Sequence, residues 1–231
     1  MEQEWPVITF IIITLNFAVL LFSYDIFTNT VSEYVIFNFG LSPAYLISKP
    51  YVLITHMFIH GDAIHFMGNI FMLAIVGLVT EQKLGSSKFL IFYFLSGLCA
   101  IPFGFLMEYL TNTVVIMIGA SGAIFGVMFI AAALSGWEEV PAILIPILNI
   151  IAAPIVFFTL KNIKVPLFIA IIFYFLMNLV MMLVNLPDSI GELAHFGGIV
   201  GGVIGLLFIA PEKMKSTKQK TTTSSQVSWP A

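Results

Sequence analysis

Seven long apolar stretches constrain the fold of this chain more than any other feature. They lie at about 7–27, 64–80, 88–107, 115–135, 141–160, 165–185 and 191–210. A helix that crosses a bilayer needs roughly 20 mostly apolar residues. Of the 231 residues, 60% are hydrophobic and only 9% are charged, whereas soluble domains average about 25% charged residues. The sequence therefore predicts an all-α polytopic membrane protein.

The stretch 141–160 differs from the others because it contains Pro141, Pro146 and Pro154. Each proline lacks a backbone donor and clashes with the preceding helical turn, and a backbone exposed to lipid must satisfy its hydrogen bonds internally. We therefore expect 141–160 to be a re-entrant or interfacial segment. The other six stretches are predicted to be the transmembrane spans.

The basic residues predict the orientation of these spans. All nine are lysines, and six spans with an inner N-terminus leave only Lys49 on the outer side. Such a bias is typical of cytoplasmic loops. We expect a multi-pass protein of the cell membrane with both termini in the cytoplasm and a long outer loop over 28–63. Residues 1–5 contain two acids and no lysine, so no cleavable signal peptide is expected.

The chain ends in a polar, low-complexity segment. We expect residues 1–211 to form the membrane domain and 212–231 to be a disordered cytoplasmic tail, whose lysines suit anionic membrane lipid. So few basic residues argue against a nucleic-acid partner. Cys99 stands alone, which excludes a disulfide framework and a cysteine-based metal site.

A first polar cluster, residues 55–69, contains His56, His60, Asp62, His65 and Asn69. His65 and Asn69 are four residues apart and share one face of a predicted helix, from which both could donate hydrogen bonds into a cavity. An alternative is that the cluster caps a helix start with interfacial histidines. A further alternative is a zinc site built from His56, His60 and Asp62, although the chain lacks a glutamate directly after His56.

A second cluster is GASGAIFG at 119–126, with Ser121 between glycines at the start of an apolar helix. The first amides of a helix lack internal partners and suit an oxyanion beside the serine hydroxyl. The alternative is a packing face of small residues from Gly122 to Gly126.

A third cluster is ELAHFGGIVGGVIG at 192–205, with His195 near the start of the last span. Gly198 and Gly202 form a GxxxG face that allows close helix approach. The alternative role of His195 is a structural hydrogen bond to a neighbouring helix.

In the six-span arrangement, the spans that begin with these three clusters all enter the membrane from the outer side. The clusters are therefore expected at one depth, just below the outer surface. A serine with a histidine in reach is the minimum for nucleophilic acyl transfer. The sequence predicts Ser121 as nucleophile and His195 as base. The Ser121 backbone N–H, His65 and Asn69 would form the oxyanion site. We expect a dyad and not a triad, because Glu192, the nearest acid, is better placed to cap its helix. No metal or cofactor is expected.

This combination resembles the rhomboid family of intramembrane serine proteases. The matching motifs are HMFIHGDAIHFMGN (56–69), GLVTEQKLG (77–85), GASGAIFG (119–126) and AHFGG…G (194–202). The resemblance covers about 50–210 and implies a six-helix core, the site residues above, and substrates with transmembrane segments that are cut near the outer membrane surface. Supporting positions would be Gly119, Gly122, Phe125, Gly198 and Gly202.

The chain departs from the family pattern in two places, which involve three residues. Tyr51 and Val52 stand where the family often has Trp-Arg, and Phe125 stands where it often has a tyrosine that stacks on the catalytic histidine. None of the three changes removes a group that does chemistry.

Two other functions remain as alternatives. One is a non-catalytic relative that binds membrane proteins, although such relatives usually lose the serine or the histidine. The other is a transporter with histidines as a proton relay, which predicts polar groups along a whole path. Here the polar groups gather at the outer ends of the spans.

Overall fold

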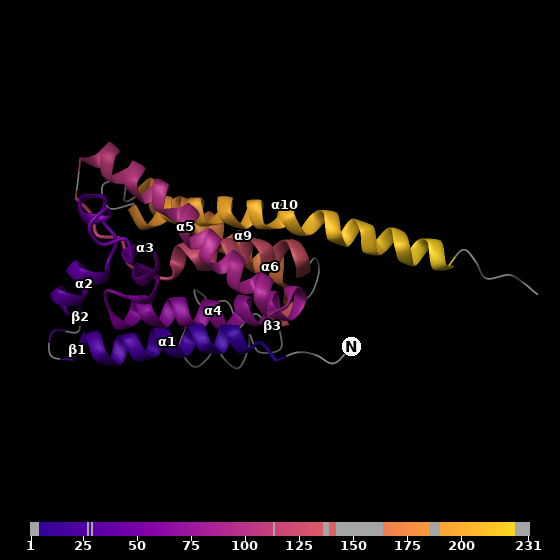
Figure 1. Cartoon of the computed structure of the whole chain (residues 1–231), viewed down its shortest axis with the longest axis horizontal. Coiled ribbons are helices and arrows are strands. Elements are labelled where there is room, and N and C mark those ends of the chain that lie inside the picture. Colours follow the sequence, from indigo (N-terminus) through magenta and orange to yellow (C-terminus); the bar gives the residue numbers. More distant parts are fainter. Residues whose placement is uncertain are drawn as a thin grey trace, which may run out of the picture.

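The structure, a computed structural model, describes residues 5–26, 28, 30–112, 114–135, 139–141, 164–184 and 190–224. The described chain is mostly helical, and the helices run along the long axis of the molecule (Figure 1). The longer helices are α1 (Val7–Ser23), α4 (Ala63–Leu84), α5 (Ser86–Thr111), α6 (Ser121–Ser135), α9 (Leu167–Val184) and α10 (Ile190–Ser224). The shorter elements are β1 (Tyr24–Asp25), β2 (Thr30–Val31), α2 (Glu33–Phe39), η1 (Pro43–Tyr45), α3 (Val52–Thr55), η2 (His56–Phe58), β3 (Glu139–Pro141) and β4 (Lys164–Pro166).

Three of these helices are long and apolar enough to cross a membrane. They are α4, α5 and the Gly191–Phe208 part of α10, with mean hydropathies of 1.9, 2.1 and 1.5. α1, α6 and Leu167–Leu176 of α9 are apolar but shorter. The prediction of a helical membrane protein is confirmed, while the count of six spans stays a prediction.

The observed helix ends differ from the predicted spans in an informative way. α4 and α5 extend beyond 64–80 and 88–107 at both ends, whereas α1 ends at Ser23 instead of 27 because the chain turns into the β1–β2 hairpin. The stretch 115–135 becomes helical only at Ser121. Its first residues are extended because Met117 pairs with Leu41, with N···O distances of 2.8 and 2.9 Å in the two directions.

The predicted re-entrant or interfacial segment 141–160 lies outside the described residues except for Pro141. The flanking strands β3 and β4 pair antiparallel, with Pro141 opposite Lys164. The end of α6 and the start of α9 therefore lie at the same end of the bundle. α10 then returns to the end at which α6 begins, as the predicted shared depth requires.

The last helix continues beyond the membrane domain predicted from the sequence. α10 runs to Ser224 and so includes residues 212–224, for which a disordered tail is expected. Lysine, glutamine and methionine are good helix formers, which explains why the helix continues there. Residues 225–231 lie outside the described part. In Figure 1, the C-terminal part of α10 projects past the end of the bundle at which α1 begins.

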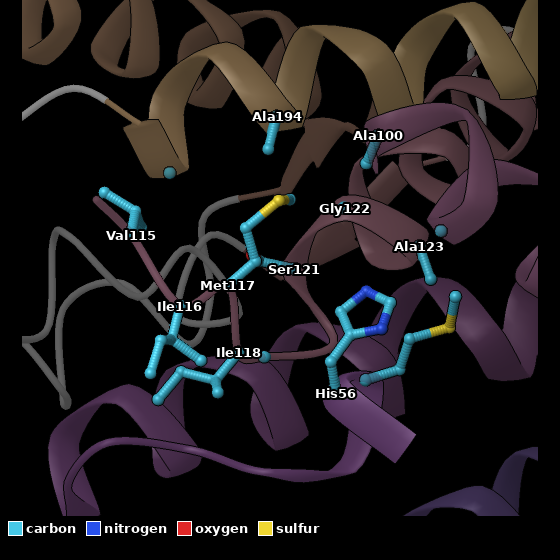
Figure 2. Close-up of a pocket in the computed structure, with 14 residues that line it drawn as sticks. His56, Ala100, Val115, Ile116, Met117, Ile118, Ser121, Gly122, Ala123 and Ala194 are labelled. Carbon is cyan, nitrogen blue, oxygen red and sulfur yellow. The ribbon is translucent and has the colours of Figure 1, made fainter. Parts of the chain in front are cut away.

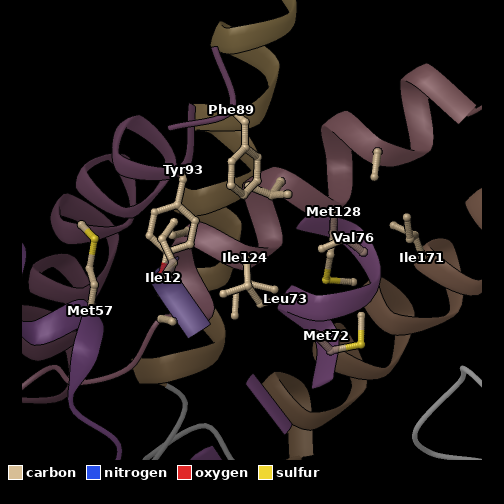
Figure 3. Close-up of a cluster of buried hydrophobic side chains, with 14 of the residues drawn as sticks. Ile12, Met57, Met72, Leu73, Val76, Phe89, Tyr93, Ile124, Met128 and Ile171 are labelled. Atoms are coloured by element: carbon tan, nitrogen blue, oxygen red, sulfur yellow. The ribbon is translucent and has the colours of Figure 1, made fainter. Parts of the chain in front are cut away.

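The core is centred on α6, which packs against α4, α5, α9 and α10. Figure 3 shows its buried side chains together with those of the neighbouring helices. They include Ile12 of α1, Leu73 and Val76 of α4, Tyr93 of α5, and Ile124 and Met128 of α6. Among lipid tails, such packing stabilises a bundle through van der Waals contact rather than through the removal of water.

Glycines let α6 and α10 touch through their backbones. A Cβ on Gly198 would overlap the Gly122 carbonyl oxygen, and one on Gly202 would lie 2.5 Å from the Gly126 oxygen. This is the close approach that small residues four apart predict. It brings the third turn of α10 against the first turn of α6.

Glu81 joins the start of α1 to the end of α4 and the start of α5. Its carboxylate accepts hydrogen bonds from the Ile8 and Thr9 amides at 2.9 and 2.7 Å, from the Thr9 hydroxyl at 2.7 Å and from the Ser86 hydroxyl at 2.6 Å. Two of the unpaired amides at the start of α1 are thereby satisfied by a negative charge. The GLVTEQKLG motif therefore fixes the position of α1.

Candidate active site

Ser121 begins α6 at the end of a constrained extended segment. Gly119, two residues earlier, has a φ of +113°, a backbone conformation that residues with a side chain rarely adopt. A Cβ on Gly119 would lie 2.9 Å from His65 Nε2 and 3.8 Å from Ser121 Oγ. The glycine is therefore required both by its backbone conformation and by the approach of His65 and Ser121 to the same point.

Four hydrogen bonds hold the segment that leads to Ser121, besides its pairing through Met117. The Val115 amide donates to the Glu108 carboxylate at 3.2 Å, and the Gly119 amide donates to the His56 carbonyl at 2.8 Å. The Ala120 amide approaches His60 Nε2 at 3.5 Å, and the Ala120 carbonyl accepts from Ile124 at 3.0 Å as α6 begins. The serine is thus presented from a segment fixed on both sides.

His195 comes to the same end of α6 through an aromatic contact. Its ring stacks on Phe125 with centroids 4.1 Å apart and planes 5° apart. Phe125 lies one turn after Ser121, so both side chains project from the same face of α6. Phe125 also stacks on Phe175 of α9 at 5.8 Å. The phenylalanine that replaces the family's usual tyrosine therefore keeps the stacking contact.

His65 lies in the first turn of α4, where Asp62 caps the helix. The Asp62 carboxylate accepts the His65 amide at 2.8 Å, so helix capping by this cluster, one of the alternatives from the sequence, is observed. His65 Nδ1 accepts the Gly61 amide at 3.4 Å. A neutral ring that accepts at Nδ1 carries its proton on Nε2. The Nε2–H donor is then the atom that lies near Gly119 and Ser121.

Asn69 is buried one turn after His65. Its amide nitrogen donates to the His65 carbonyl at 2.9 Å, which leaves its second amide hydrogen for another acceptor. The structure therefore brings His65 and Ser121 to the same point at Gly119, and it sets Asn69 one turn after His65 on the same face of α4.

Sequence reasoning did not identify the roles of His56 and His60. His56 Nδ1 donates to the Val52 carbonyl at 2.7 Å, and the carbonyl of His56 holds Gly119. His60 packs edge-on against His65, with centroids 5.1 Å apart. Both histidines thus support the segment before Ser121, a use that differs from the zinc alternative. Among the described residues, no group of three His, Cys, Asp or Glu side chains is close enough to hold a metal ion.

The surroundings of these two histidines favour their neutral forms. Burial lowers the pKa of His56 to about 4, although the hydrogen bond to the Val52 carbonyl acts in the opposite direction and raises it. Burial, and then the neighbouring His65, lower the pKa of His60 to about 3. Desolvation disfavours the imidazolium because the charged ring loses its hydration. Near neutral pH both rings are therefore uncharged and keep the hydrogen bonds described above.

Ser121 lines a cavity of about 350 Å³ (Figure 2). The cavity is bounded by the extended segment 115–119, the first turn of α6, the starts of η2 and α10, and α5. Most lining side chains are small or apolar, among them Gly97, Ala100, Met117, Gly122 and Ala194. Ser121 and His56 are the polar exceptions. The cavity can therefore receive a peptide segment with apolar side chains beside a serine hydroxyl.

Tyr51 and Val52, which replace the family's usual Trp-Arg pair, anchor the loop differently. The Tyr51 ring contacts Phe39 with centroids 6.0 Å apart, and Val52 is fully buried. The Thr55 hydroxyl also donates to the Phe39 carbonyl at 2.7 Å. Apolar packing and one hydroxyl thus hold α2 against α3.

Comparison with known proteins covers the part of the chain that carries this site. Residues 48–212 match the sequence model of the Rhomboid domain. RHOMBOID-like protein 1 of Arabidopsis thaliana is 26% identical over 160 residues, which make up 68% of this chain and 34% of that protein. The chain thus spans about a third of the length of this relative.

Proposed function

The chain belongs to the rhomboid family, and from this premise we propose that it is an intramembrane serine endopeptidase with a Ser121–His195 dyad. Proteins of this family are generally intramembrane serine proteases. The observation that carries the proposal is the stacking of His195 on Phe125, one turn after Ser121. The stacking holds the His195 ring one helical turn from Ser121 along α6, which supports His195 as its base.

In the proposed reaction, Ser121 Oγ attacks the carbonyl carbon of the scissile peptide bond while His195 accepts the hydroxyl proton. His195 then returns this proton to the leaving amine, and an acyl-enzyme ester remains on Ser121. Water, deprotonated by His195, attacks the ester and releases the new carboxyl end. The serine regains its proton in the same step.

The negative charge on the tetrahedral intermediate needs donors that are already in position. We assign this role to the Ser121 backbone N–H, His65 Nε2–H and the second amide hydrogen of Asn69. The position of His65 Nε2 near Gly119, together with acceptance at its Nδ1, supports this assignment. Removal of one such donor typically costs about 10²–10³-fold in kcat.

The proposed substrates are membrane proteins with transmembrane segments, cut near the outer membrane surface. Two features support this: the serine begins α6 at the end of the bundle that carries the loop elements, and the cavity walls are mostly apolar. The proposed orientation, with both termini in the cytoplasm, rests on the distribution of lysines.

The test is cleavage of a fluorescently labelled transmembrane substrate in liposomes. Ser121→Ala and His195→Ala are expected to abolish cleavage, while Ser135→Ala, a buried serine at the other end of α6, is the matched control and keeps it. Asn69→Ala is expected to lower kcat with little change in KM, because the donor acts mainly in the transition state. Cleavage by Ser121→Ala or His195→Ala at the wild-type rate would exclude the dyad.

A further inference from the structure

An apolar groove of about 460 Å³ lies on the side of the molecule where α1 meets α2 and η2. Leu15 and Phe22 of α1, Val35 and Phe39 of α2, and Phe58 of η2 contribute to its lining. Leu15 is 48% exposed and Phe22 is 92% exposed. In a membrane protein, large apolar side chains with such exposure face the hydrocarbon tails of the lipids, so the groove opens toward lipid.

The two polar side chains in this lining have their hydrogen bonds satisfied inside the protein. The Ser23 hydroxyl donates to the Val19 carbonyl at 2.6 Å, and the Thr55 hydroxyl donates to the Phe39 carbonyl at 2.7 Å. An occupant of the groove therefore gains little from polar groups. The chemistry of the lining suits a saturated or unsaturated hydrocarbon chain.

Lys49 supplies a positive charge at α2, the helix whose Val35 and Phe39 line the groove. Lys49 Nζ is 3.1 Å from Asn38 Oδ1 and 3.3 Å from the Phe37 carbonyl, the two residues before Phe39. It also lies 5.1 Å from the centre of the Tyr45 ring. All these partners are neutral, so within the described residues no carboxylate compensates the charge. A phosphate group would compensate it.

The groove and the active-site cavity share a wall. Thr55, Phe58 and Ile59 line the groove, whereas His56 and Met57, between them in the sequence, line the cavity with Ser121. A molecule in the groove would pack against the back of the segment whose His56 carbonyl holds Gly119.

We propose that this groove binds one acyl chain of a membrane phospholipid, with the lipid phosphate at Lys49. The apolar lining selects the chain, and the uncompensated lysine selects the headgroup. The proposal goes beyond the cleavage chemistry and does not depend on it, because binding can be measured on catalytically inactive protein.

The test uses the full chain in nanodiscs of phosphatidylcholine with a small fraction of phosphatidylglycerol that carries a diazirine on one acyl chain. After illumination, mass spectrometry maps the crosslinked residues. We expect crosslinks concentrated on residues 15–23 and 35–39. Ala18→Trp, which fills the groove, is expected to reduce them several-fold. Leu21→Trp is the matched control, since Leu21 is 68% exposed on the same helix and outside the lining.

Lys49→Gln tests the headgroup part of the proposal. Crosslinking by the phosphatidylglycerol probe is expected to fall about fivefold, the factor that corresponds to ~1 kcal/mol for one lysine near an anionic lipid. Equal crosslinking in wild type and Ala18→Trp would overturn the proposal. If Ala18→Trp does not fold, the wild-type map decides alone, because crosslinks spread evenly over all lipid-facing helices would also overturn the proposal.

Discussion

At the scale of single residues, Gly119 carries the most demanding position of the candidate site. It has a positive φ, and a Cβ there would meet His65. Gly85, between α4 and α5, also has a positive φ of +81°, but a Cβ at that position would have no other atom within 4 Å. An alanine at Gly85 would therefore strain only the backbone, whereas an alanine at Gly119 would strain the backbone and also displace His65.

Gly119→Ala and Gly85→Ala are expected to differ in activity more than in stability. Each substitution costs about 1–3 kcal/mol, because residues with a side chain rarely adopt a positive φ. Only Gly119→Ala also pushes His65 away from Ser121, and a misplacement of about 1 Å in an active site can cost ~10²-fold in rate. Melting temperature in detergent and cleavage in liposomes measure the two effects. Equal activities of the two folded variants would contradict the described position of His65.

The roles of the histidines show how far residue-level prediction could go. The spacing of His65 and Asn69 on one helix face is visible in the sequence, and so is the proximity of Ser121 to a helix start. The roles of His56 and His60 were not predictable, because their partners are backbone groups of the segment before Ser121. Only the folded chain brings these groups together.

The burial of His56 and His60 predicts that the folded protein loses stability in acid. The folded protein keeps His56 and His60 neutral until the pH approaches their pKa values of about 4 and about 3, whereas the unfolded chain binds protons below about pH 6.5. This contribution is therefore complete above pH 6.5 and is lost as the pH falls toward 4, by up to about 1.4 kcal/mol per pH unit for each histidine.

Melting temperatures in detergent between pH 7.5 and 4.5 measure this loss. The double variant His56→Gln, His60→Gln is expected to melt at a lower temperature at pH 7.5 but to show a flatter dependence on pH. A slope as steep as that of the wild type would show that other groups cause the acid sensitivity.

At the scale of helices, the contact between α6 and α10 holds the two proposed catalytic residues together. Gly202 meets the Gly126 carbonyl oxygen, so this contact has no room for a methyl group. Ser121 begins α6, and His195 lies in the second turn of α10. Separation of the helices would therefore move the proposed base relative to the nucleophile.

Gly202→Ala is expected to destabilise the protein by about 1–3 kcal/mol, as overpacking of a tight contact does, and to lower cleavage. Gly68→Ala on α4 is the matched control, because a Cβ there has open space. Alanine is favoured over glycine inside a helix, so this variant should be neutral or slightly stabilising. Thermal unfolding of both proteins in the same detergent provides the comparison.

Most helices could be predicted from apolar length, but their ends could not. Residues 115–120 are as apolar as the helix that follows, and only the long-range pairing of Met117 with Leu41 makes them extended. The end of α1 at Ser23 depends in the same way on the β1–β2 hairpin. Hydropathy contains no information about such pairings.

At the scale of the whole molecule, the distribution of lysines predicts on which side of the membrane the candidate site lies. Ser48 lies in the segment predicted outside, and Ser87 follows the α4–α5 turn predicted inside. Both residues are exposed. A membrane-impermeant maleimide is expected to label intact cells that express Ser48→Cys but not those that express Ser87→Cys. Both variants should react after permeabilisation, and the reverse pattern in intact cells would contradict the orientation.

The arrangement of the whole molecule follows from topology that the sequence expresses only in part. The prolines of 141–160 indicate a segment unlike the other spans, and the pairing of β3 with β4 brings the end of α6 and the start of α9 together. The stacking of Phe125 on His195 then confirms that the starts of α6 and α10 lie at one end. The close backbone contact that makes this stacking possible depends on glycines in both helices.

A fluorophosphonate probe tests most directly whether His195 activates Ser121, because such probes react with activated serines. Intact-mass and peptide mass spectrometry of the labelled protein locate the adduct. We expect a single adduct on Ser121 that disappears in His195→Ala and persists in Ser135→Ala. An adduct on Ser121 that forms equally fast in His195→Ala, or no adduct on Ser121 in the wild type, would contradict it.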